Sequence, residues 1–192
     1  MRHISPNLIL ATFVIVPAAV AVTVTSTSNP APRAVAAEPL RATAQIIDLS
    51  GRTIGSAQLT EAAGGGVNIA MAAHSLPQGQ LAWHIHQVGT CTPADQFASA
   101  GSHFNPLNKA HGFEHTGGHH AGDLPNLNVS EAGVVRTRVT TPNITLMQGT
   151  TTSVFDADGS ALIIHSKADD YTSQPAGDAG TRIACAVIKP AQ

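Results

Sequence analysis

The sequence has few charged and few aromatic side chains. Asp, Glu, Lys and Arg make up 11% of its 192 residues, aromatic residues make up 4%, and the formal net charge is -2. Because the sequence has no basic cluster to meet phosphate groups, it does not indicate a protein that binds nucleic acid. Glycine, threonine, alanine and valine are plentiful instead, and this composition favours short strands and glycine-containing turns over helices.

Long apolar runs are also scarce, and the clearest one lies near the N-terminus. A short basic start precedes an apolar run over residues 8–24, and small residues follow at 34–36. Residues 1–37 are therefore predicted to be a signal peptide or, as the alternative, an uncleaved N-terminal membrane anchor. Either alternative exports residues 38–192, a single domain, to a periplasmic, cell-envelope or secreted location. No cysteine lies directly after the run, which argues against a lipid-modified cysteine at a processed N-terminus.

Cysteine is nearly absent, with Cys91 and Cys185 the two examples. An even pair in an exported chain indicates one disulfide, and two separate buried thiols are the alternative. Closing a loop of about 95 residues would constrain the unfolded chain by roughly 4 kcal/mol on the loop-entropy model.

Alternating apolar and polar residues, separated by Gly, Pro and Ser, predict about eight strands. The runs lie at 42–49, 55–62, 67–74, 81–88, 127–130, 134–141, 161–165 and 182–188. An antiparallel sandwich or closed barrel is the expected fold. Between residues 88 and 122 over 30 residues lack periodicity. Loops of that length inside a compact domain are usually functional or disordered.

Histidines are concentrated in and beside this loop. The chain has ten, and most lie between His84 and His120. His84 and His86 are two apart on a predicted strand, so both imidazoles point to one side and could bind the same ion. Taken alone, such a pair is about as consistent with a chance surface feature as with a metal site. A lone histidine at a strand end, such as His165, is more often an ordinary polar residue. Neutral imidazole is a common ligand of zinc and copper, so the whole set predicts a metal centre.

Six separated motifs resemble the copper/zinc superoxide dismutase family, and in particular its exported bacterial members. They are HIH at 84–86, GSHFNP at 101–106, HG at 111–112, HAGDLPN at 120–126, HSKADD at 165–170 and GDAGTRIACAVI at 177–188. The resemblance extends from about residue 41 onward. It implies an all-β fold, an eight-stranded antiparallel Greek-key barrel or sandwich with long metal-bearing loops. The implied enzyme converts superoxide to dioxygen and hydrogen peroxide by alternating reduction and reoxidation of copper, and so protects against extracytoplasmic superoxide.

The same resemblance implies a ligand set for copper and for a structural zinc. The implied copper ligands are His84, His86, His103 and His165, and the implied zinc ligands are His103, His111, His120 and Asp123. His103 would bridge the two ions, and three histidines with one carboxylate suit a closed tetrahedral zinc site.

Further residues match family positions outside the two ligand sets. Asp169 is expected to hydrogen-bond both His84 and His111, and Cys91 and Cys185 take the positions of the family's disulfide. Arg182 would lie beside copper and orient superoxide, so the implied catalytic residues are Arg182 and His103.

Other features of the sequence leave alternatives open. The segment 166–181 is short, which puts electrostatic guidance of the substrate in doubt. His115 and His119 are expected to be exposed loop residues rather than extra ligands. A protein that stores copper or zinc and a zinc hydrolase are the alternative functions; the complete ligand set and Arg182 argue against the first, and the closed zinc set argues against the second. The sequence leaves open a membrane tether through the N-terminus and a homodimer.

Overall fold

The computed structural model describes residues 38–191, and the predicted signal or anchor at 1–37 lies outside them. Two short 3-10 helices, Pro93–Asp95 and Ala98–Ala100, accompany nine strands in these residues. The strands are β1 (Arg41–Asp48), β2 (Thr53–Glu61), β3 (Val67–Ala73), β4 (Gly79–Leu81), β5 (Trp83–His86), β6 (Leu127–Val129), β7 (Val135–Thr141), β8 (Ala161–His165) and β9 (Arg182–Pro190). The predicted all-β class is confirmed. Within the described range, no helix has the length and apolar character that a membrane span requires.

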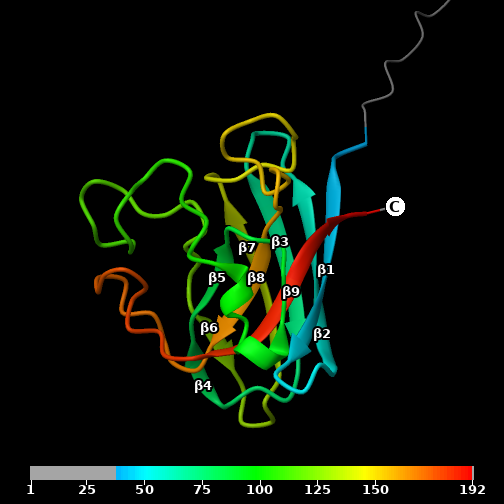
Figure 1. Ribbon diagram of the computed structural model, residues 1–192, viewed down its shortest axis with the longest axis vertical. Helices are drawn as coiled ribbons and strands as arrows, with labels where there is room; N and C mark the ends of the chain where they lie inside the picture. Colours follow the sequence, from blue (N-terminus) through cyan, green and yellow to red (C-terminus); the bar gives the residue numbers. More distant parts are fainter. Residues whose placement is uncertain (1–37, 192) are drawn as a thin grey trace, which may run out of the picture. The chain divides into compact units, whose positions relative to one another are not determined.

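Seven of the strands form one curled antiparallel sheet. Its order is β5-β8-β9-β1-β2-β3-β7, and β4 pairs with β6 in a separate two-stranded sheet. Strands distant in sequence are therefore neighbours: β9 pairs with β1, and β8 pairs with β5. Figure 1 shows the connection 166–181, in orange and red, and the outer part of the green connection 87–126 on the side of the molecule away from β1 and β2. The two 3-10 helices of the green connection lie near β9 instead. The expected antiparallel arrangement with long loops is confirmed.

The predicted run at 81–88 is divided at Ala82. Ala82 N–H donates to Lys167 O over 2.7 Å, and Ala82 O accepts a hydrogen bond from His165 N–H over 2.8 Å. The strand thus changes partners at this residue, because β4 pairs with β6 while β5 pairs with β8. One continuous alternating run in the sequence becomes two strands.

The core explains which way the histidines of β5 point. Trp83 and Ile85 belong to the main apolar core, with exposed fractions of 1% and 0%. Alternation along the strand then sends His84 and His86 to the opposite face, beneath the long loops. Trp83 is also fixed at its polar end, since Nε1–H donates to Pro125 O over 2.7 Å. Burying each of these two apolar side chains contributes about 1.5–3 kcal/mol.

The two cysteines form the predicted disulfide. Cys91 and Cys185 are joined with their Cα atoms 5.7 Å apart. Cys185, Phe97 and Ile163 pack in a second, smaller apolar cluster on the outer side of β8 and β9. The bridge therefore attaches the start of the long loop to the last strand.

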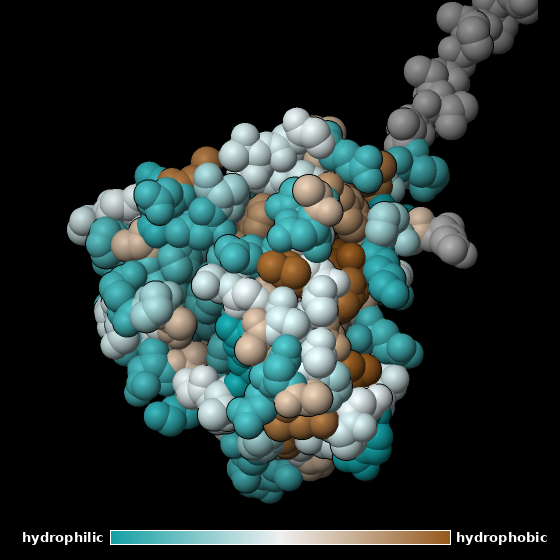
Figure 2. All heavy atoms as spheres, viewed as in Figure 1, coloured by the Kyte–Doolittle hydropathy of each residue, from teal (hydrophilic) through white to brown (hydrophobic). Residues whose placement is uncertain are grey.

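The surface is mixed in character. Among the described residues the large apolar side chains with substantial exposure are Leu40, Leu49, Leu107, Phe113, Val134 and Met147. On the face drawn in Figure 2, hydrophobic residues appear in small groups among hydrophilic ones.

Candidate metal centre

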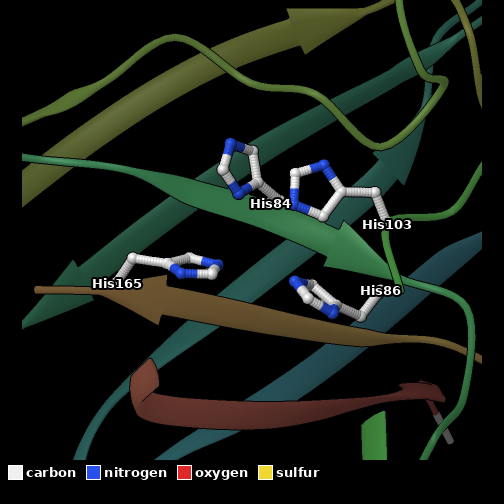
Figure 3. A group of neighbouring side chains, drawn as sticks. All are labelled: His84, His86, His103 and His165. Carbon is white, nitrogen blue, oxygen red and sulfur yellow. The ribbon is translucent and has the colours of Figure 1, made fainter. Parts of the chain in front are cut away.

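Four buried histidines converge from two strands and one loop. His84 and His86 come from β5, and His165 comes from the end of the neighbouring strand β8. His103 comes from the long loop, which forms a bridge with β5 at His86. Figure 3 shows the four rings turned toward a common space. One nitrogen from each ring, four in all, lies within 4.8 Å of the other three. These are the four histidines that the sequence predicts around copper.

Hydrogen bonds commit one nitrogen on three of these rings. His84 Nε2–H donates to Asp169 Oδ2 over 2.8 Å, and His86 Nδ1–H donates to Gly101 O over 2.9 Å. His165 Nδ1 lies 3.5 Å from Gly180 O. Such bonds fix the tautomer of each ring and leave its other nitrogen with a free lone pair.

The opposite nitrogens have no hydrogen-bond partner. Five buried side-chain atoms of the described residues lack one, and four of them are His84 Nδ1, His86 Nε2, His103 Nε2 and His165 Nε2. Buried polar atoms are rarely left unpaired, so four that face each other need a common partner. A metal ion that accepts four nitrogens meets this requirement, and four nitrogens suit copper(II).

Burial keeps three of the four rings neutral at neutral pH. Desolvation lowers the pKa of His86 well below its usual value, lowers the pKa of His103 to about 4, and lowers that of His165 to about 3. An imidazole must be unprotonated to bind a metal ion. His86, His103 and His165 are therefore in the form that a metal requires.

A second group of donors meets on the other side of His103. Asp123 Oδ1 lies 3.0 Å from His103 Nδ1, 3.1 Å from His111 Nδ1 and 3.4 Å from His120 Nδ1. With zinc bonds of about 2.0–2.2 Å, ligand atoms at the corners of a tetrahedron lie about 3.3 Å apart. The observed separations thus fit a tetrahedral zinc site with three nitrogens and one oxygen. His103 is the residue shared by both groups.

Asp123 also organises the loop that carries its partners. Its Oδ2 accepts backbone N–H groups from Gly112 at 3.0 Å and His120 at 3.1 Å. Burial would raise the pKa of this carboxyl group, but hydrogen bonds with His103 and His111 outweigh burial and hold the pKa far below its usual range. Asp123 is therefore ionised, as a metal ligand must be.

Asp169 connects the two groups of donors. Its Oδ2 accepts from His84 Nε2–H, and its Oδ1 accepts from His111 Nε2–H over 3.0 Å. Burial favours the neutral form of His111, yet Asp123 and Asp169 outweigh burial and raise the pKa of His111 to about 9. One carboxylate thus orients a histidine of each group, as expected from the sequence.

Three residues that sequence reasoning did not single out hold this arrangement. Asn126 exchanges hydrogen bonds with the backbone N–H and C=O of Asp169, at 2.8 and 2.9 Å. Tyr171 N–H donates to Asp169 Oδ1, and the Tyr171 hydroxyl accepts from Asn126 N–H. Gln174 bonds to the backbone of His111. Asn126 lies inside the HAGDLPN motif, which was the available signal for it.

Arg182 reaches the cavity from the start of β9. Its Nη1–H donates to Phe97 O and its Nη2–H donates to Gly101 O over 2.6 Å. A cavity of about 450 Å³ is lined by Arg182 together with His86, His103 and His165. The guanidinium group is therefore fixed at a cavity that is also lined by three of the histidines predicted to bind copper.

The remaining loop residues lie outside both groups of donors. His115 is exposed, and His119 Nδ1–H donates to His120 O over 2.8 Å. Within residues 38–191, neither histidine joins a group that could hold an ion. In the short segment 166–181, Lys167 lies 3.6 Å from Asp178, an exposed ion pair.

Comparisons with known proteins agree with this geometry. The family model for copper/zinc superoxide dismutase matches residues 53–188. The chain is 46% identical over 154 residues to "Superoxide dismutase [Cu-Zn] 1" of Aquifex aeolicus, covering 80% of this chain and 90% of that protein. It is 43% identical over 145 residues to the superoxide dismutase-like protein YojM of Bacillus subtilis, covering 75% and 74%.

A solved structure shows the same likeness in three dimensions. The crystal structure of a SOD-like protein from Bacillus subtilis aligns with a TM-score of 0.72 at 42% identity, over 75% of this chain and 95% of that chain. The similarity thus includes both the sequence and the arrangement of the strands.

Proposed function

Because this chain belongs to the copper/zinc superoxide dismutase family and is an enzyme of that type, we propose a residue-level assignment for its reaction. Copper binds to His84, His86, His103 and His165, and zinc binds to His103, His111, His120 and Asp123. The observation that supports this assignment most strongly is the set of four facing ring nitrogens without a hydrogen-bond partner. When bound, copper supplies one-electron redox chemistry that turns one superoxide into dioxygen and a second into hydrogen peroxide.

Arg182 binds and orients the substrate in this proposal. Two backbone carbonyl groups hold its guanidinium at the cavity, so little conformational freedom remains to be lost when an anion arrives. A fixed cation attracts superoxide and donates charge-assisted hydrogen bonds to it. Because Gly101 O accepts from both Arg182 and His86, the anion site and one copper ligand share an anchor.

His103 handles a proton at Nε2. Its Nδ1 lies in the zinc group, while Nε2 faces the other three histidines. In our proposal Nε2 holds a proton between the two half-reactions and donates it to the departing peroxide. The Nδ1 side keeps the ring in place meanwhile.

Zinc has a structural role in the proposal. Three of its four proposed ligands, His111, His120 and Asp123, lie in a single segment of the long loop. An ion bound there closes that segment on itself and on His103, which keeps the copper side aligned.

Residues 1–37 are proposed to export the domain at 38–192, either as a signal peptide or as an anchor that tethers it to a membrane. The disulfide between Cys91 and Cys185 supports an oxidising, extracytoplasmic location. There the enzyme would remove superoxide outside the cytoplasm. A homodimer also stays a proposal.

The deciding experiment is superoxide dismutation by the purified chain, with copper and zinc measured in the same sample. Fast turnover with about one copper and one zinc per chain, lost on removing copper and regained on adding it, is expected. A fully metallated chain without turnover would instead indicate metal storage. Turnover that needs zinc but no copper would contradict the ligand assignment.

A further inference from the structure

A group of unpaired cations lies on the sheet surface that the metal centre does not use. Arg136 and Arg138 are two apart on β7, and both are exposed. Arg41 lies on the same outer face at the start of β1, because the register runs from Arg41 to Thr60, from Thr60 to Asn68, and from Asn68 to Thr140. None of the three arginines forms an ion pair within the described residues.

No acidic side chain offsets these cations within the four strands. The acidic residues of β1, β2, β3 and β7 are Asp48 and Glu61. Asp48 is paired with Arg52 at 2.8 Å, and Glu61 accepts hydrogen bonds from Thr145 and Leu146. Residues 38–191 carry eight Lys and Arg against twelve Asp and Glu, hence a formal charge of -4. Strands whose unpaired charges are all cations are therefore a marked asymmetry in an acidic domain.

The two arginines of β7 border a shallow hollow. Their neighbours across the sheet are small, since Arg136 faces Ala72 and Arg138 faces Ala70 in the register. Ser56 and Gln58 of β2 follow in the same rows. These side chains line a hollow of about 300 Å³. Two guanidinium groups with a hydroxyl and an amide beside them supply donors suited to a phosphate ester.

We propose that this face, which carries Arg136 and Arg138 at the hollow and Arg41 farther along the sheet, docks onto the phosphate headgroups of an anionic membrane. Charge complementarity favours such a surface, because basic side chains near anionic lipids are each attracted independently. The proposed N-terminal anchor favours a membrane over a soluble polyanion, because it would hold the domain close to the lipid. The apolar run at 8–24 is followed by 17 residues ending at Arg41, which can extend to at most about 55 Å.

Docking in this way leaves the metal centre accessible. The face belongs to β1, β2, β3 and β7, whereas the cavity with Arg182 lies among β5, β8 and the long loops. In Figure 1 the connection 166–181 and the outer part of the green connection lie on the side away from β1 and β2. The proposal concerns where the enzyme resides and does not depend on the ligand assignment.

The test compares two kinds of vesicle with the purified full chain. Sedimentation is measured with neutral phosphatidylcholine vesicles and with vesicles in which about one third of the lipid is phosphatidylglycerol. The apolar N-terminus contributes in the same way to partitioning into both kinds of vesicle. Taking the ratio of the two partition coefficients therefore removes its contribution. In the double variant Arg136→Gln/Arg138→Gln this ratio should fall on the order of 10- to 30-fold at low salt. High salt should abolish the preference of the unchanged chain.

A control of equal charge is Arg52→Gln/Lys167→Gln, which removes two cations that are already paired with acids. This control should keep the ratio of the unchanged chain. Metal content and turnover confirm that each variant is folded. An equal ratio in Arg136→Gln/Arg138→Gln and the unchanged chain would overturn the proposal. Binding to polyphosphate or heparin without a preference for anionic vesicles would overturn it in favour of a soluble polyanion.

Discussion

His111 and Gln174 exchange two hydrogen bonds in opposite directions. His111 N–H donates to Gln174 Oε1 over 2.8 Å, and Gln174 Nε2–H donates to His111 O over 2.9 Å. The residues come from the two long loops, 63 positions apart in the chain. The amide of Gln174 therefore fixes the backbone of a proposed zinc ligand from outside the zinc loop.

Replacing Gln174 by Ala should make zinc leave faster. Loss of two hydrogen bonds, each worth about 1 kcal/mol, should accelerate zinc release roughly 5- to 30-fold. The release rate to a coloured chelator measures this. Gln148→Ala is a matched control, because Gln148 is exposed and is not part of the metal centre. Equal zinc release from both variants would show that the two hydrogen bonds between Gln174 and His111 do not retain zinc.

Replacing Asp169 by Asn should weaken zinc binding by about 10- to 100-fold, since a residue that orients metal ligands contributes on this scale. An asparagine offers one acceptor oxygen where His84 and His111 each donate to a separate oxygen. Competition with a chelator gives the affinity. The neighbouring Asp170→Asn is the control, because Asp170 is exposed and bonds to Thr172 and Ser173. If the two variants bind zinc equally well, the bridging role of Asp169 is wrong.

Gly177→Ala should release the metals as well as lower stability. Gly177 has φ +70°, and an added Cβ would collide with the Asp169 carboxylate and with His111 Nε2. Gly149→Ala separates the two effects, because Gly149 has φ +78° and open space around it. Both variants should lose about 1 kcal/mol from the left-handed backbone. Only Gly177→Ala should lose zinc and copper during equilibrium dialysis. If this variant retains both metals fully, the close packing of Gly177 against Asp169 and His111 is not needed for metal binding.

Arg182→Ala should slow dismutation at least about tenfold while copper and zinc content stay the same, because the variant lacks the cation that we propose attracts and orients superoxide. Pulse radiolysis at several salt concentrations measures the rate. The unchanged enzyme should slow as salt rises, and the variant should respond less. A variant with the normal rate and the normal salt dependence would remove Arg182 from the mechanism.

The sequence predicts the elements of this protein well where side chains repeat at a regular spacing. Alternation across Trp83, His84, Ile85 and His86 indicates both the strand and the side on which the histidines lie, and the structure agrees. The division at Ala82 was not foreseeable in this way. It depends on hydrogen bonds to Lys167 and His165, residues more than 80 positions away.

The candidate site shows the same contrast. The sequence-predicted donors are found together in the two groups, and Asp169 was named through the family resemblance. Gln174 was missed because an amide in an irregular loop has no periodicity, and its partner atoms belong to the backbone of His111. Contacts of this kind become visible once the two loops are placed side by side.

Trp83 gives the protein an optical property. It is the single tryptophan of the chain, it is adjacent to His84, and its indole N–H binds Pro125, two residues beyond Asp123. Its emission should therefore be blue-shifted while the segment around Pro125 is packed against it. The emission should move to longer wavelength when that segment detaches. A paramagnetic ion at the neighbouring histidines should quench it. The enzyme thus contains an intrinsic fluorophore with which metal loading can be followed in real time, without any label.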